Sequence, residues 1–152
     1  MGGSEIKIYE LWRKYATDDV DLIRELDKIE NDEKAIEERF YKELEFGTAG
    51  IRGIIGAGTA RMNIYVVRKV TQAFCEYLTK NFENPSVAIG YDNRIKSDLF
   101  AKEAACVFAA NGIFVNIYKE IMPVPCLSYA VRNLGCDAGI MVTASHNPAQ
   151  YN

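Results

Sequence analysis

Apolar and polar residues follow a helical period over the first 45 residues, which predicts three short helices. The first is expected over residues 6–16, with one apolar face formed by Ile8, Leu11, Trp12 and Tyr15. The second, over residues 17–29, opens with Thr17 and acidic residues, the usual composition of a helix start. Its apolar repeat consists of Val20, Ile23 and Leu26. The third, over residues 31–44, begins at Asn31, and the dense charge of this region is expected to face solvent.

The pattern changes at residues 44–62, LEFGTAGIRGIIGAGTARM, where five glycines replace the helical repeat. Their spacing matches neither the Walker A loop nor a dinucleotide-binding fingerprint between a strand and a helix. Two interpretations stay open. The glycines can form tight turns that need positive φ, or the segment can bind an anion through its amides together with Arg52 and Arg61.

Helical and strand patterns then alternate to residue 142. A long amphipathic helix is expected over residues 63–82, capped by Asn63 and with Arg68 and Lys69 on its solvent side. Three short strands and two helices follow, and Ser97 is the expected cap of the first of these helices. The strands are expected at 86–92, 113–119 and 137–142, and the helices at 97–112 and 124–135. This βαβαβ order predicts an α/β fold, a three-layer α/β/α domain with a mostly parallel (mixed) sheet, preceded by N-terminal helices.

Ligands of open α/β sheets bind beyond the carboxyl ends of the strands. This rule selects two polar loops, one at residues 92–94 after the first strand and one at residues 143–148 after the third. Ser145 in the second loop is a candidate nucleophile, because its small neighbours Thr143 and Ala144 would leave its hydroxyl open.

A Ser–His–Asp triad explains this loop poorly. His146 is adjacent to Ser145 and its ring is expected to point away, and the chain has no GxSxG elbow. A serine that carries a phosphoryl group needs cations, a proton acceptor and an aligned substrate instead. Arg52 and Arg94 could supply charge, and His146 could move a proton or donate a hydrogen bond. On the residues alone, a turn serine and a structural histidine remain open.

Composition and charge narrow the possible partners. Residues 1–45 carry 14 acidic and 8 basic residues, whereas residues 46–152 carry 7 and 10, so the polar loops lie in the cationic part. Ten scattered bases do not form a nucleic-acid surface, and a small anionic ligand fits better. No apolar run could span a membrane. The four cysteines lack zinc-site spacing and are expected to be reduced thiols of a cytoplasmic protein.

Three segments resemble the α-D-phosphohexomutase family, and they occur in the family's order over residues 45–152. TASHNPAQYN resembles the phosphoserine loop, EFGTAGIRG the N-terminal arginine loop, and GYDNR the segment after the first core strand. The stretch GAGTARMN resembles the phosphoglucomutase branch.

The resemblance implies interconversion of glucose 1-phosphate and glucose 6-phosphate by an intramolecular phosphotransferase, through a phosphoserine and a hexose 1,6-bisphosphate. By that likeness Ser145 carries the phosphoryl group and gives one oxygen to Mg²⁺, and His146 acts beside it as a proton carrier or positioning group. Arg52, Thr143 and Asn147 would bind substrate or phosphate. Glucose 1,6-bisphosphate would be the activator.

The resemblance also predicts a division at residue 45. Residues 1–44 would form a helical extension and residues 45–152 the phosphoserine domain, domain I, ending shortly after the catalytic loop. The family's DGDxDR-type magnesium loop and its two later substrate loops are not in this sequence, and Asp19 and Asp21 are not expected to replace them. We therefore expect C-terminal domains of the same polypeptide as partners, and an inactive isolated domain. A phosphomannomutase, a phosphopentomutase and a non-catalytic sugar-phosphate-binding module remain alternatives.

Overall fold

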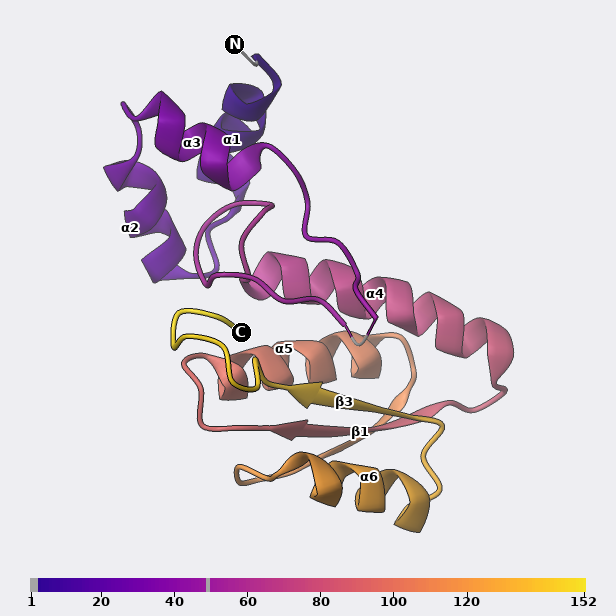
Figure 1. Ribbon diagram of the computed structural model, residues 1–152. Coiled ribbons are helices and arrows are strands. Elements are labelled where there is room, and N and C mark those ends of the chain that lie inside the picture. The colour runs from indigo at the N-terminus through magenta and orange to yellow at the C-terminus, as the bar shows by residue number, and fades with distance from the viewer. Residues whose placement is uncertain (1–2, 49) are drawn as a thin grey trace. The chain divides into compact units, whose positions relative to one another are not determined.

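The computed structural model describes residues 3–48 and 50–152 (Figure 1). Two compact units divide the chain: an N-terminal unit up to Val66 that also includes Tyr151, and a C-terminal unit from Val67 to Gln150 that also includes Asn152. The helices are α1 (Gly3–Tyr15), α2 (Val20–Lys28), α3 (Glu33–Phe40), α4 (Ile64–Asn81), α5 (Ser97–Ala110) and α6 (Val124–Asn133). The strands are β1 (Ser86–Tyr91), β2 (Phe114–Ile117) and β3 (Ala138–Val142). None of these helices has the length and apolar character that a membrane crossing needs, over the residues described.

The three predicted N-terminal helices are present, but two of the predicted faces were partly wrong. In α1 the buried residue is Tyr9, whereas Leu11 and Tyr15 are 55% and 64% exposed. In α2 the buried residues are Leu22 and Leu26, not Val20. The caps also shift, because Asp19 accepts from the Asp21 amide and Asp32 from the Ala35 amide, in place of Thr17 and Asn31. A carboxylate two or three residues before a free amide satisfies it best, and this decides the start of each helix.

The glycine segment packs tightly within the N-terminal unit. Asn63 is buried, and its Nδ2 donates to the carbonyls of Gly56 and Gly58 at 2.9 Å each. Its Oδ1 accepts from the Val66 amide, which confirms Asn63 as the cap of α4. Glu25 of α2 accepts from the Ala57 amide at 2.8 Å. Residues 56–63 are therefore a packed turn, whereas anion binding by Arg52 and the rest of this segment stays a prediction.

The C-terminal unit contains a three-stranded parallel sheet in the order β2-β1-β3. On one face the core joins β1 to α4 and α5; its fully buried members include Cys75, Leu78, Val87, Ile89 and Phe108. On the other face Ala88 packs against Leu127 and Ala130 of α6. The predicted α/β/α layering is thus confirmed, and Figure 1 shows α5 and α6 on opposite sides of β1 and β3.

Strand register sets where the polar loops begin. Tyr91 at the end of β1 pairs with Val142 at the end of β3, so Asp92 and Thr143 leave the sheet side by side. The amide of Asp92 donates to the carbonyl of Val142 at 3.2 Å. Because the strands are parallel, both loops must emerge at the same edge.

The start of α5 differs from the prediction in a way that matters for this edge. Its N-cap is Lys96, in the left-handed region with φ 62°, and it makes no capping side-chain hydrogen bond. Ser97, the predicted cap, is instead fully buried and donates to Asp92 Oδ1 at 2.8 Å. The Ser97 hydroxyl therefore holds the loop after β1, and it does not cap the N-terminus of α5.

Candidate functional site at the carboxyl edge of the sheet

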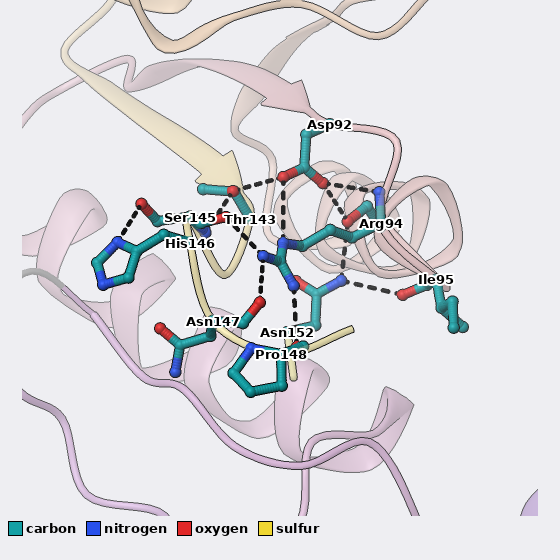
Figure 2. Close-up of polar contacts among 10 residues, drawn as sticks. Asp92, Arg94, Ile95, Thr143, Ser145, His146, Asn147, Pro148 and Asn152 are labelled. Atoms are coloured by element: carbon teal, nitrogen blue, oxygen red, sulfur yellow. Dashed lines mark hydrogen bonds and ion pairs between the residues drawn. The ribbon is translucent and has the colours of Figure 1, made fainter. Parts of the chain in front are cut away.

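Asp92 is the centre of a hydrogen-bonded cluster that joins the two loops (Figure 2). Its Oδ1 accepts from the Arg94 amide at 3.0 Å and from Ser97 Oγ, and its Oδ2 accepts from Thr143 Oγ1 at 2.5 Å. Burial alone would raise the pKa of Asp92, but the hydrogen bonds from Thr143, the Arg94 amide and Ser97, together with the nearby guanidinium, outweigh it and lower the pKa. The carboxylate is therefore held ionised between β1 and β3.

Replacing Asp92 by asparagine is expected to destabilise the C-terminal unit by about 1–3 kcal/mol at neutral pH. Asparagine keeps one acceptor oxygen, and its NH₂ group would face a donor on the other side. The ionised form stabilises the fold above the pKa of an unfolded aspartate, about 4, and this stabilisation is lost as pH falls through the lower pKa of the folded state. Urea unfolding followed by far-ultraviolet circular dichroism should show a difference at pH 7 that shrinks as the solution is acidified below about pH 4.

Asp98→Asn provides the matched control, since Asp98 lies in the first turn of α5, six residues beyond Asp92, and its carboxylate forms an exposed ion pair with Lys102. Asp98→Asn should lower the free energy of unfolding by less than about 1 kcal/mol. Equal losses in the two variants would mean that the Asp92 cluster contributes nothing beyond an ordinary surface charge.

Thr143 connects this carboxylate to Ser145. While its hydroxyl donates to Asp92, its oxygen accepts from the Ser145 amide at 2.9 Å. Ser145 lies in a left-handed conformation with φ 53°, one of two non-glycine residues with positive φ among those described. Ala144 is buried beneath it, and Ser145 itself is exposed. The turn thus presents the hydroxyl outward from the edge of the sheet, as the small-residue pattern predicted.

His146 contradicts the expectation that its ring points away. Nδ1 lies 3.3 Å from Ser145 Oγ, and Figure 2 shows the two side chains turned toward each other. The carboxylate of the site, Asp92, is committed to Thr143, Ser97 and the Arg94 amide. The geometry therefore forms a serine–histidine pair without the hydrolase arrangement in which a carboxylate orients the histidine.

The three arginines that the sequence suggested as anion-binding groups, Arg52, Arg61 and Arg94, lie in different surroundings. Arg94 does not point to the Ser145 hydroxyl, because its guanidinium donates to backbone carbonyls of the loop. Arg61 pairs with Glu38 at 2.5 Å in the N-terminal unit, and its side chain is only 11% exposed. Arg52 also lies in the N-terminal unit, at an exposed position. Thr143, Ser145, His146 and Asn147 are brought together, and the role of Arg52 stays a prediction.

One further residue of the cluster, Asn152, was not recognised in the sequence, and Ser97 was predicted only as a helix cap. Asn152 is buried, and its Nδ2 donates to Ser97 Oγ at 2.8 Å and to the Ile95 carbonyl at 3.1 Å. Ser97 Oγ in turn donates to Asp92 Oδ1, so Asn152 is linked to Asp92 through Ser97. An asparagine after a proline-containing loop reads as an ordinary turn residue, so nothing in the pattern indicated that Asn152 folds back to the start of α5.

The sequence predicts that only Ser145, through its phosphate, contributes to a magnesium site, and this contribution stays a prediction. Within residues 3–48 and 50–152, no group of three or more His, Cys, Asp and Glu side chains is arranged to hold a metal ion. Asp19 caps α2 by accepting a hydrogen bond from the Asp21 amide. Both oxygens of Asp92 already accept hydrogen bonds. The side chains that the structure describes therefore do not form a complete magnesium site by themselves.

The fold and this edge define an α/β/α domain that presents a serine–histidine loop at the ligand-binding end of a parallel sheet. The family model for phosphoglucomutase/phosphomannomutase, alpha/beta/alpha domain I, matches residues 43–152. The chain belongs to this family.

Relatives extend this result. A phosphoglucomutase of Staphylococcus saprophyticus is 50% identical over 109 residues, which cover 72% of this chain and 20% of that protein. A Staphylococcus aureus phosphoglucomutase is 43% identical over 145 residues, covering 94% and 25%. A Schizosaccharomyces pombe protein assigned as a phosphoribomutase is 40% identical over 124 residues, covering 80% and 21%. The chain spans between a fifth and a quarter of the length of these curated relatives.

A solved structure agrees with the fold. The crystal structure of a Thermus thermophilus protein assigned to the phosphomannomutases is similar to this chain with a TM-score of 0.67 and 34% identity. The match covers 72% of this chain and 24% of that one.

Proposed function

We propose that this chain is the phosphoserine domain of a mutase that interconverts glucose 1-phosphate and glucose 6-phosphate. Residues 45–152 would form this domain, and residues 1–44 a helical extension. The relatives that carry the phosphoglucomutase name, at 43% and 50% identity, support this choice of reaction.

The observation that carries the proposal is the presentation of Ser145. Its hydroxyl is exposed, its backbone is held in a left-handed turn, and a histidine nitrogen lies 3.3 Å from the hydroxyl oxygen. A phosphoryl carrier must stay reachable from solvent and keep a fixed direction, because catalysis of phosphoryl transfer is mostly positioning and charge stabilisation. An ordinary turn serine has no need of the supporting chain Asp92–Thr143–Ser145.

The proposed transfer conserves the phosphoryl group. In the first half, a sugar hydroxyl oxygen attacks the phosphorus on Ser145, a new P–O bond forms, and the bond from Oγ to phosphorus breaks. The sugar's hydroxyl proton leaves to a base, Ser145 Oγ takes up a proton as it departs, and the product is the hexose 1,6-bisphosphate. In the second half, the Ser145 hydroxyl gives up this proton as Oγ attacks the other phosphoryl group of the bisphosphate, the departing sugar oxygen is protonated, and the isomeric monophosphate leaves.

The neighbouring residues would transfer protons and bind the phosphate. His146 would accept or return a proton beside Oγ, because its Nδ1 lies within reach of that oxygen. Thr143, Asn147 and Arg52 would bind the phosphate or the substrate.

The rest of the active site would come from further domains of a longer polypeptide, consistent with the relatives' greater length. Toward Mg²⁺ this chain would contribute one ligand, a phosphoryl oxygen on Ser145, and the bound ion would neutralise phosphate charge. The four free cysteines are consistent with a cytoplasmic protein.

A specific alternative exists for the sugar of the substrate. The Schizosaccharomyces pombe relative assigned as a phosphoribomutase favours a pentose phosphate as a second candidate. A matched panel of glucose 1-phosphate, mannose 1-phosphate and ribose 1-phosphate, compared by kcat/KM in the full-length protein, would separate these substrates.

Phosphorylation of Ser145 is the direct test. Incubation of the full-length protein with glucose 1,6-bisphosphate and Mg²⁺ should add one phosphate, located on Ser145 by mass spectrometry of its peptide. Ser128, which lies on an exposed face of α6, serves as an internal control and should stay unmodified. A protein that binds sugar phosphate while Ser145 never gains phosphate would instead be a non-catalytic binding module.

A further inference from the structure

The guanidinium of Arg94 lies beneath the Ser145 loop and binds its backbone. Nη2 donates to the carbonyl oxygens of Ser145 at 2.5 Å and Asn147 at 2.7 Å, and Nη1 donates to that of Pro148 at 3.1 Å. The side chain is only 14% exposed. Figure 2 shows it on the opposite side of the loop from the Ser145 hydroxyl and the His146 ring. Arg94 is therefore placed to hold the backbone, and it does not face the reacting oxygen.

The carbonyls that Arg94 binds belong to a strained stretch of chain. A non-glycine residue at φ 53° costs about 1–2 kcal/mol relative to an extended or helical conformation, so the surroundings must hold Ser145 there. The Thr143 hydroxyl fixes the entry of the turn through the Ser145 amide. Arg94 fixes its exit, since its contacts run from the Ser145 carbonyl to that of Pro148.

Arg94 is itself anchored to the neighbouring loop. Its amide donates to Asp92 Oδ1, and its Nε lies 3.8 Å from Asp92 Oδ2. Asp92 follows β1 directly, so the guanidinium transmits the position of the sheet edge to the loop after β3. A planar guanidinium has a rigid fork of donors that can bind several carbonyls at once, which a single ammonium group cannot reproduce.

We propose that Arg94 is a positioning residue that holds the Ser145 loop in its left-handed, outward-facing geometry, and, resting on the proposed function, that it sets the rate of phosphoryl transfer without binding the phosphate. Two variants separate this role from charge. Arg94→Lys keeps the positive charge and loses the fork, whereas Arg94→Gln loses both.

Amide hydrogen exchange measured by NMR on the 152-residue chain tests the positioning role without reference to activity. In Arg94→Lys the amides of Ser145 and Asn147, which are bonded within the loop, should exchange about five-fold faster or more. The amides of β1 should keep their wild-type rates, which excludes general unfolding. Arg132→Lys, an exposed arginine on α6 bonded to Ser128, is the matched control and should leave the loop unchanged.

Steady-state kinetics of the full-length mutase tests the consequence. Displacement of the nucleophile by a fraction of an ångström to one ångström lowers kcat, so Arg94→Lys and Arg94→Gln should both lose about 10–100-fold in kcat. KM for the sugar phosphate should stay within about three-fold, because under this proposal Arg94 holds the loop and makes no contact with the substrate.

The outcomes separate the two proposals. Faster loop exchange together with reduced kcat in both variants supports the positioning role. Near-normal activity in Arg94→Lys with a large loss only in Arg94→Gln overturns it in favour of a charge role, and unchanged loop exchange in Arg94→Lys also overturns it. If the wild-type protein shows no mutase activity, the proposed function is refuted, and the exchange rates alone then decide whether Arg94 holds the loop.

Discussion

Ser145→Ala is expected to lower mutase turnover in the full-length protein by about 10³-fold or more, because no other group would carry the phosphoryl group between the two halves of the reaction. The fold should be retained. Ser145 is exposed in a loop, and the hydrogen bonds of its amide and carbonyl to Thr143 and Arg94 are backbone contacts that alanine preserves. The measurement is turnover of glucose 1-phosphate, together with phosphate incorporation from glucose 1,6-bisphosphate.

Ser145→Gly serves as the matched variant, since it also removes the hydroxyl but tolerates φ 53° without the steric cost of a Cβ. Both variants should be inactive, whereas the glycine variant should be the more stable of the two by about 0.5–1 kcal/mol. Turnover within a factor of about ten of wild type in either variant would rule out Ser145 as the phosphoryl carrier.

The C-terminal unit could be predicted from sequence because its signals are local and agree with one another. Short apolar strands alternate with amphipathic helices, and Gly112 and Gly135 follow α5 and α6 with φ 75° and 65°, as helix-terminating glycines do. Strand order then requires both polar loops to leave the same edge of the sheet. The elements of this unit therefore agree with the prediction to within a few residues.

The N-terminal helix faces could not be predicted in the same way. Helix α1 has apolar residues on more than one side, and the pattern cannot tell which side meets a partner. Tyr9 is buried in the structure, and its hydroxyl donates to the Leu26 carbonyl at 2.9 Å. Trp12 packs against Phe40 in a T-shaped contact. These contacts join residues far apart in sequence, so the exposed positions of Leu11 and Tyr15 follow from tertiary packing.

The same limit applies to the support of the candidate site. The sequence indicated Ser145, His146 and the edge on which they lie, but it suggested that Arg94 supplies charge to a phosphate. Its actual acceptors, the carbonyls of Ser145, Asn147 and Pro148, lie more than 50 residues away in the chain. The left-handed φ of Ser145 and the return of Asn152 to Ser97 also depend on loops that meet only after the sheet has formed. Sequence patterns can locate a polar loop, but they do not specify which backbone groups it pairs with.

Gly58→Ala is expected to destabilise the N-terminal unit by about 3 kcal/mol or more. Gly58 has φ 124°, a conformation that side chains rarely adopt, and a Cβ there would overlap the carbonyl oxygen and Cβ of Arg39 at the end of α3. Neither group can move freely. Arg39 pairs with Glu25 at 3.0 Å, and its carbonyl accepts from the Ala60 amide at 2.9 Å. The added methyl group would therefore disturb the contact between the glycine turn and α3.

Gly50→Ala isolates the backbone part of this cost. Gly50 belongs to the same unit and has φ 141°, but no atom of the described residues beyond its chain neighbours lies within 4 Å of the place that a Cβ would take. Gly50→Ala should therefore lower the free energy of unfolding by only about 1 kcal/mol. Urea unfolding can be followed by the fluorescence of Trp12, the single tryptophan, which packs against Phe40 and Tyr65 in this unit. The difference between the two midpoints measures the steric contact with Arg39. Equal losses would show that the chain around Arg39 relaxes to accept the methyl group, and the glycine would then be required for its φ alone.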